Sequence, residues 1–159
     1  MTMTELFNFL NAPLHNSRWS WGAVNPFNKD IVLRVWADER REIGGNKHCY
    51  FISGKLRWTD EEGNEQVWDS NDEPDRLGQK ERDLQVGGFD GSQRIILVVC
   101  HAEDVNASPR AIKEFNQKTI LVAKEVVEYE GGLYAKATER LPVMTYRQAA
   151  TMSPEECAS

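Results

Sequence analysis

The sequence predicts a single α+β domain built on a curved, mixed, mainly antiparallel sheet or a small barrel. Short apolar runs, some alternating and some continuous, recur along the chain and are typical of strands. Glycine-containing turns separate several of these runs, which indicates hairpins. The length of 159 residues is common for one domain. We expect about seven or eight strands and about three short helices, in a domain at 1–146 followed by a frayed tail at 147–159.

Eight segments have the apolar pattern of strands. They lie at 18–22, 31–36, 48–52, 55–58, 66–68, 94–100, 119–129 and 133–138. The second and sixth are the most continuously apolar, which predicts burial on both faces. Turns with glycine join the fourth strand to the fifth and the seventh to the eighth as hairpins. In the first of these hairpins, Trp58 and Trp68 are expected to be cross-strand partners.

Three helices are predicted from capping signals and helical spacing. They lie at about 3–11, at about 74–84 and after Pro109. The segment Thr2–Glu5 has the spacing of a capping box, which begins the first helix. Leu77 and Leu84 are the expected anchors of the second, although Gly78 weakens it by about 1 kcal/mol. Ile112 and Phe115 have the spacing of an apolar face on the third.

Charge and composition limit the kinds of partner. The net charge of −6 lies in residues 54–90, which carry five basic and eleven acidic side chains. A protein that binds duplex DNA mainly through phosphates is usually basic, so any nucleic-acid contact here must be local. Three cysteines without framework spacing favour reduced thiols in a cytoplasm. There is neither an apolar run of about 18 residues for a membrane span nor a signal-peptide pattern in residues 1–15.

Two mirror-image pairs of possible metal ligands occur on predicted strands, His48 with Cys49 and Cys100 with His101. Thiolate and imidazole ligands suit zinc. Adjacent residues of a strand point to opposite faces, however, so one pair does not readily supply two ligands. The alternative, which we favour, is that both cysteines are buried in core strands. We therefore predict no metal and no cofactor.

Other polar residues are weaker candidates for catalysis. His101 is followed by Glu103 and Asp104 at a strand end, a place where a general base can lie, but no nucleophile is paired with it in the sequence. Glu128 and Lys136 flank a hairpin and resemble the carboxylate and lysine of a nuclease. A cross-strand ion pair explains these two equally well. The sequence therefore favours a binding protein over an enzyme.

Aromatic and basic residues give the main functional signal. All five tryptophans lie between residues 19 and 68. Arg18, Trp19, Trp21, Arg34 and Trp36 come from two strands that are expected to be neighbours. Flat aromatic faces beside guanidinium groups are what a base-binding pocket needs, because stacking contributes about 1–3 kcal/mol per base. The alternative is that the tryptophans only pack the sheet.

A second basic candidate lies where the third helix is expected. Ser108 is the predicted N-cap and Pro109 the first helical residue. Arg110 and Lys113, three residues apart, would lie on one face of its first turns. A helix N-terminus favours phosphate, so these two residues are candidate phosphate contacts. Two exposed cations on a solvated face are the alternative.

The order of features also resembles a known group of folds. The segments NSRWSWGAV to DIVLRVW and VVCHAEDVNASPRAIKEFN carry the likeness. In layout the chain resembles the PUA-like superfamily, whose ASCH, EVE and SRA-type members read RNA or modified DNA bases in an aromatic-lined pocket. The chain contains neither the GxKxxExR signature of ASCH domains nor the glycine-rich block of SRA domains. The resemblance therefore implies a base-reading pocket but transfers no residue role.

Together these features favour a small nucleic-acid-recognition domain that binds a base or nucleotide, with bacterial or phage defence or counter-defence as one setting. The predicted ligand-binding residues are Arg18, Trp19, Trp21, Arg34, Trp36, Arg110 and Lys113. One alternative is an interaction or inhibitor module that presents the acidic segment 60–75 to a protein partner. The other is an enzyme that uses His101.

Overall fold

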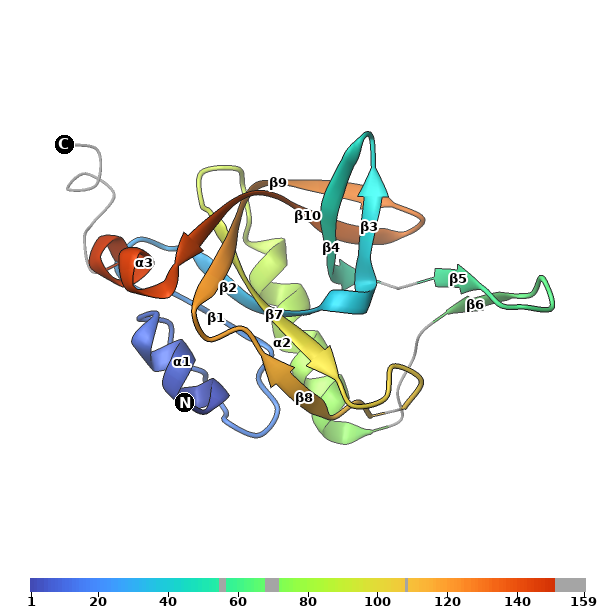
Figure 1. Ribbon diagram of the computed structural model, residues 1–159, viewed down its shortest axis with the longest axis horizontal. Helices are drawn as coiled ribbons and strands as arrows, with labels where there is room; N and C mark the ends of the chain where they lie inside the picture. Colours follow the sequence, from blue (N-terminus) through green and yellow to red (C-terminus); the bar gives the residue numbers. More distant parts are fainter. Residues whose placement is uncertain (55–56, 68–71, 108, 151–159) are drawn as a thin grey trace.

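The computed structural model describes residues 1–54, 57–67, 72–107 and 109–150 (Figure 1). The fold is α+β, as predicted. The strands are β1 (Gly22–Val24), β2 (Ile31–Trp36), β3 (Arg40–Ile43), β4 (Asn46–Gly54), β5 (Arg57–Thr59), β6 (Glu65–Val67), β7 (Ile95–Ala102), β8 (Ile112–Phe115), β9 (Thr119–Tyr129) and β10 (Gly132–Pro142). The helices are α1 (Met3–Phe9), α2 (Glu73–Gly87) and α3 (Val143–Ala150), with a 3₁₀ helix, η1 (Ala37–Glu39).

The main sheet is mixed and curved. Its strands follow the order β1-β2-β7-β9-β10-β4-β3, and β8 pairs with β7 beside this path. β2 and β7 are parallel, whereas the other pairs in the described part of the sheet are antiparallel. β2 and β4 are not neighbours in this order, yet they contact each other because the sheet curls. The curl does not close into a barrel, so the open alternative of the predicted architecture is correct.

The two faces of the sheet bury different helices. Side chains alternate along β2, so Leu33 joins one apolar cluster and Val32 the other. α1 and α3 cover the face that includes Val32 (Figure 1). α2 covers the opposite face, where Val86 packs beside Leu33. No helix in the described part of the chain is long and apolar enough to cross a membrane.

Several predicted elements are confirmed. Thr2 and Glu5 form a complete capping box at the start of α1. The strand predicted at 31–36 is β2, residue for residue. The strand predicted at 94–100 is present as β7, which begins one residue later at Ile95, is flanked by β2 and β9 and is buried over most of its first six residues. In these segments the apolar pattern and the position in the sheet agree.

The strand predicted at 18–22 is wrong, because residues 17–19 form a turn and β1 begins only at Gly22. Asn16 directs this turn. Its side-chain oxygen accepts hydrogen bonds from the backbone N–H groups of Arg18 at 2.8 Å and Trp19 at 3.3 Å. Ser20 closes the turn, since its hydroxyl accepts from the Asn16 N–H at 2.9 Å. These local side-chain bonds compete successfully with the alternating pattern.

The helix predicted after Pro109 is also wrong, because residues 112–115 form β8, antiparallel to β7. Ser108, its expected N-cap, lies outside the described residues. Ile112 and Phe115 are three residues apart, a spacing that indicates a helix face in a regular chain. A register shift lies between them, which lets both pack against the core from a strand.

The helix predicted at 74–84 is present as α2, but its expected anchors are wrong. Leu84 is 71% exposed and Leu77 is 38% exposed. The buried face instead carries Gly78, Arg82 and Val86, at intervals of four residues. Two of the three buried positions of α2 are therefore a glycine and an arginine, where apolar side chains are usual.

The predicted hairpin around residues 60–64 is present as β5 and β6, which form a separate two-stranded sheet that projects from the body (Figure 1). Trp58 lies opposite Gln66 in this pairing, and Trp68 lies outside the described residues. β3 was not predicted, nor was α3. Because α3 continues to Ala150, the chain is helical beyond the predicted start of the frayed tail at 147; residues 151–159 lie outside the described part.

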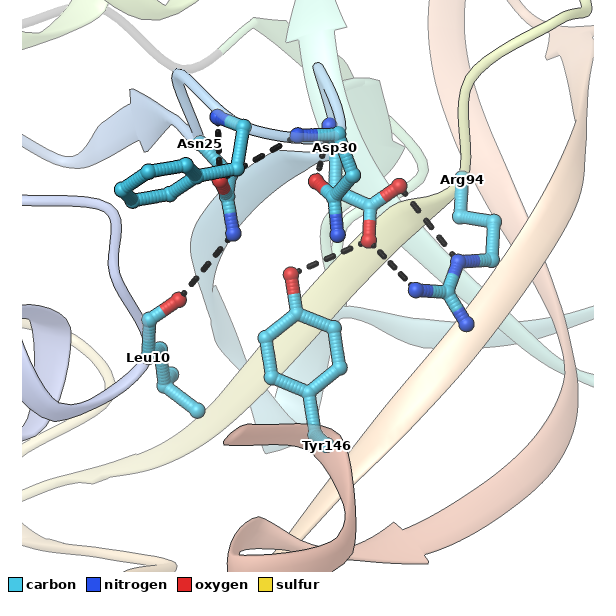
Figure 2. Close-up of polar contacts among 7 residues, drawn as sticks. Leu10, Asn25, Asp30, Arg94 and Tyr146 are labelled. Carbon is cyan, nitrogen blue, oxygen red and sulfur yellow. Dashed lines mark hydrogen bonds and ion pairs between the residues drawn. The ribbon is translucent and has the colours of Figure 1, made fainter. Parts of the chain in front are cut away.

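A buried polar network joins α3 to the turn between β1 and β2 (Figure 2). Asp30 is 3% exposed and accepts hydrogen bonds from Nη2 of Arg94 at 2.8 Å and from the hydroxyl of Tyr146 at 3.0 Å. Nε of Arg94 donates to the second carboxylate oxygen at 3.4 Å. In the same turn, the side-chain amide of Asn25 reaches the backbone carbonyl of Leu10 at 3.4 Å. The network therefore ties the N-terminal segment, the sheet and the last helix together.

Candidate functional site

Trp21 and Arg34 meet at the end of β1, where the β1–β2 pairing continues by one residue. The backbone N–H of Arg34 donates to the carbonyl of Trp21 at 2.9 Å. The guanidinium carbon of Arg34 lies 6.0 Å from the centre of the Trp21 ring, within the range of a cation–π contact. The sequence predicted that these two residues would be neighbours on adjacent strands, and the structure brings them together.

Gly78 allows α2 to approach Trp21 closely. A Cβ atom at this position would lie 2.4 Å from the backbone oxygen of Trp19 and 2.6 Å from the indole nitrogen of Trp21. One turn later, the Arg82 guanidinium lies 4.9 Å from the Trp21 ring and 5.3 Å from the Phe51 ring. The absence of a side chain at Gly78 therefore places Arg82 beside two aromatic rings.

Arg82 is buried without a full set of hydrogen bonds. It is 5% exposed, and neither Nε nor Nη2 has a hydrogen-bond partner among the described residues. The carboxylate of Asp83 lies 4.0 Å from Nε, too far for a hydrogen bond, and accepts one from Ser53 at 2.7 Å. Burial lowers the pKa of Arg82 to about 10. A buried charge without a hydrogen-bonded counter-ion is costly, so this arginine is unusual in a protein interior.

A third arginine, Arg110, lies beside these residues, in the segment before β8. Both terminal nitrogens of Arg110 donate to the carboxylate of Asp38, each at 2.8 Å. Nη2 also donates to the carbonyl of Val105 at 2.7 Å. The guanidinium lies 5.2 Å from the Trp36 ring. Arg110 thus links η1 to the loop after β7 and lies against one tryptophan of the site.

Glu39, also in η1, is the acidic group deepest in this region. Its side chain is 11% exposed and lies 3.7 Å from Nη1 of Arg110. Burial raises its pKa from an ordinary value of 4.5 to about 7, and the charges of Arg110, Arg82 and Arg41 only partly oppose that rise. Near neutral pH, Glu39 therefore offers less negative charge to the neighbouring arginines than an ordinary carboxylate would.

These side chains surround a small cavity of about 10 Å³. Its lining residues, which together we call the Arg82 site, are Trp21, Arg34, Val35, Trp36, Arg82 and Cys100. Burial raises the pKa of the Cys100 thiol to about 11, so this cysteine is not a thiolate nucleophile at neutral pH. The volume accommodates one group of about the size of a water molecule. The cavity is therefore too small for a whole base.

No protein-family model, curated protein or solved structure matches the chain. The chemistry of the residues in the site is what indicates a ligand. Guanidinium groups beside aromatic faces favour anions and planar groups. In the described part of the chain, no cluster of three or more His, Cys, Asp or Glu residues has the arrangement of a metal site.

The predicted ligand-binding residues separate into two groups. Trp21, Arg34 and Trp36 line the Arg82 site, and Arg110 lies beside it, although not on a helix. The remaining predicted residues lie elsewhere; they are Arg18, Trp19 and Lys113. Arg18 is exposed in the turn, the Trp19 ring lies 5.8 Å from that of His15, and Lys113 is exposed on β8. The strand predicted to carry Arg18 and Trp19 and the helix predicted to carry Lys113 do not form, and these three residues do not line the Arg82 site.

The other polar candidates are not assembled into a catalytic group. His101 is exposed on β7 opposite Glu114, and the nearby Glu103 and Asp104 are exposed. Cys49 and Cys100 are buried in different apolar clusters. Lys136 does form a cross-strand ion pair, at 3.7 Å, but its partner is Glu125 and not Glu128.

Sequence reasoning missed the residue at the centre of the site. Arg82 lies in a polar helix among many charged residues and has no apolar pattern around it. The signal that could have found it is the spacing of Gly78, Arg82 and Val86, which puts all three on one helical face. Glycine disfavours a helix, so a glycine inside one indicates that another part of the chain packs closely against the helix at that position.

Proposed function

We propose that the chain is a small nucleic-acid-recognition domain that binds a nucleotide at the Arg82 site. The observation that supports this is the meeting of two tryptophans and two arginines around one cavity, with hydrogen-bond donors of Arg82 still available. Arg34 and Arg82 would hold an oxygen of a phosphate. The outer faces of the tryptophans would supply apolar contact for the sugar or base.

The size of the cavity narrows the earlier expectation of a base-binding pocket. A volume of about 10 Å³ admits one phosphate oxygen but not a base. Recognition would therefore depend mainly on the phosphate, with the base outside. The net charge of −6 agrees with a few local contacts and not with an extended basic surface. Bacterial or phage defence or counter-defence stays a prediction from the sequence.

Binding to labelled oligonucleotides tests the proposal directly. The panel contains single and double strands, with and without a 5′-phosphate and modified bases, measured by fluorescence anisotropy at several salt concentrations. Neutralisation of one phosphate of a single strand predicts a slope of about −0.7 for log K against log salt. Lack of binding at the lowest salt concentration would exclude the proposed function.

A pair of charge-matched variants locates the binding site. Arg34→Gln removes a cation that lines the cavity, whereas Lys124→Gln removes an exposed cation from β9. We expect at least about tenfold weaker binding for the first and little change for the second, because loss of a charged hydrogen bond costs about 1.5–3 kcal/mol. Equal weakening in both variants would place binding elsewhere. Trp21→Ala is a poorer test, since Trp21 also contacts Gly78 and Arg82.

The β5–β6 hairpin supports a second proposal, a protein-interaction module. Glu61, Glu62 and Glu65 are exposed on this hairpin, which projects from the body (Figure 1). A basic protein partner would recognise such a surface through complementary charge. If this is the function, a stable complex with a basic protein is lost when the acidic residues at 60–65 are changed to lysine, and oligonucleotides do not bind.

A further inference from the structure

We infer that the cavity of the Arg82 site binds one small free monovalent anion of halide size. This ligand is distinct from nucleic acid, and the inference does not depend on the proposed function. It follows from three properties of the site: a buried charge that nearby carboxylates compensate only weakly, a pair of available donors and a cavity that fits a single atom.

The charge of Arg82 is poorly balanced by the carboxylates around it. Glu39 acts on Arg82, but its pKa is raised to about 7 and it lies 3.7 Å from Nη1 of Arg110, so it compensates Arg82 only in part. The nearest carboxylate to Arg82, that of Asp83, has a side chain 41% exposed and lies at 4.0 Å, where solvent screens its charge. Arg34 adds a second cation to the same cavity. An anion balances this charge, whereas a water molecule would satisfy the donors only.

The available donors of Arg82 belong to one edge of the guanidinium group. Nε and Nη2 both lack partners among the described residues, and these two N–H groups project from the same side of the planar fork. The corresponding edge of Arg94 holds the carboxylate of Asp30. In the Arg82 site the volume of about 10 Å³ excludes a carboxylate but leaves room for a single atom that accepts from both groups.

The aromatic rings make the site suitable for a weakly hydrated anion. Trp21 and Phe51 lie 4.9 Å and 5.3 Å from the guanidinium group and stabilise its charge by cation–π contact. They also cover its faces, so the edge formed by Nε and Nη2 is a place at which an anion can balance the charge. Binding there would stabilise the packing of α2 against β4 and the end of β1.

Thermal unfolding in different sodium salts tests the inference. We compare chloride and bromide with methanesulfonate, which is too large for the cavity, at one fixed sodium concentration and pH. A ligand that binds only the folded state raises Tm. We expect Tm in chloride or bromide to exceed that in methanesulfonate by about 2–4 °C. Equal Tm values in the three salts would overturn the inference.

Two variants separate site binding from general salt effects. Arg82→Met keeps an apolar stem between Trp21 and Phe51 but removes the donors, so the halide-dependent shift should disappear. Lys80→Gln removes an exposed cation from the same helix and should keep the full shift. A shift of unchanged size in Arg82→Met would overturn the inference. If that variant does not fold, anomalous diffraction from a bromide-soaked crystal decides: a peak beside Arg82 supports the site, and peaks only elsewhere refute it.

Discussion

Arg94 and Arg82 present the same edge of a guanidinium group to very different surroundings. At Arg94, Nε and Nη2 both donate to Asp30, which also accepts from the buried Tyr146 hydroxyl (Figure 2). At Arg82, the same two nitrogens have no partner among the described residues, although this side chain is the more deeply buried. The Arg94 guanidinium thus uses this edge for hydrogen bonds within the fold, whereas the Arg82 guanidinium makes no such bond to the described residues.

The difference lies in how completely each guanidinium group is hydrogen-bonded within the fold. Buried polar groups in native proteins are almost always hydrogen-bonded, and a group that is not needs a separate explanation. The Asp30 network has a structural explanation, since it joins three parts of the chain that are distant in sequence. At the Arg82 site, the guanidinium makes cation–π contacts with Trp21 and Phe51, but Nε and Nη2 donate to none of the described residues. These two nitrogens are the observation on which the proposed ligand site rests.

Breaking the Asp30 network should have the largest effect. Asp30→Ala leaves the buried hydroxyl of Tyr146 without its acceptor and removes both bonds to Arg94. We expect a loss of about 3 kcal/mol in the free energy of unfolding, measured by urea denaturation. This is less than the full cost of an unpaired buried charge, because the Arg94 side chain is 30% exposed and water can solvate it.

A surface ion pair is the control for that prediction. Glu125→Ala removes an acidic residue that is 62% exposed and lies 3.7 Å from Lys136. Exposed pairs contribute about 0–1 kcal/mol, so this variant should be nearly as stable as the wild type. Similar losses in the two variants would show that Asp30 has no special structural role.

The packing of α2 against Trp21 gives the next largest effect. Gly78→Ala introduces a Cβ atom 2.4 Å from the Trp19 carbonyl oxygen, and neither that backbone nor the helix can yield without displacing Trp21. We expect a net loss of about 2 kcal/mol from overpacking, despite the better helix propensity of alanine. Gly87→Ala, in the same helix with no atom within 4 Å of the new Cβ, should stabilise or leave stability unchanged. If Gly78→Ala behaves like Gly87→Ala, the close approach is not a constraint.

The sequence predicts elements best where one pattern is sufficient. β2 and β7 are mainly apolar strands paired with each other inside the sheet, and burial on both faces explains their composition without reference to any distant residue. The capping box at Thr2 is equally local. The Asn16 turn and the irregular β8 strand show the limit of prediction from spacing alone. Side-chain hydrogen bonds form a turn where alternation indicates a strand, and a register shift allows a strand where the spacing indicates a helix.

The candidate site is harder to predict, because its members come together only in the folded chain. Trp21 and Arg34 are on neighbouring chain segments, so their contact could be anticipated. Arg82, however, joins them from a helix about fifty residues later, and Arg110 from beyond β7. Nothing in the composition of α2 distinguishes Arg82 from the other charged residues of this helix. Its role depends on the close approach that Gly78 permits.

The smallest of these effects concerns Glu39 and the charge balance around it. In the folded protein its pKa is raised to about 7, whereas the ordinary value is 4.5. Between these values the folded state keeps a proton that the unfolded chain releases, so stability falls as the pH rises through this range. The loss is complete once the pH exceeds the folded pKa. Urea denaturation at pH 6 and pH 8 should show a decrease of about 1 kcal/mol attributable to this residue.

Glu39→Gln isolates this contribution, because glutamine does not ionise. The variant should lose about that much of the wild-type pH dependence, whereas Glu42→Gln, an exposed neighbour on β3, should keep all of it. Identical pH dependence in the wild type and Glu39→Gln would mean that Glu39 is an ordinary carboxylate, and therefore that it balances the charge of the nearby arginines. That outcome would weaken the contrast between the two guanidinium groups, since an ionised Glu39 would then act on Arg82 as a nearby counter-ion.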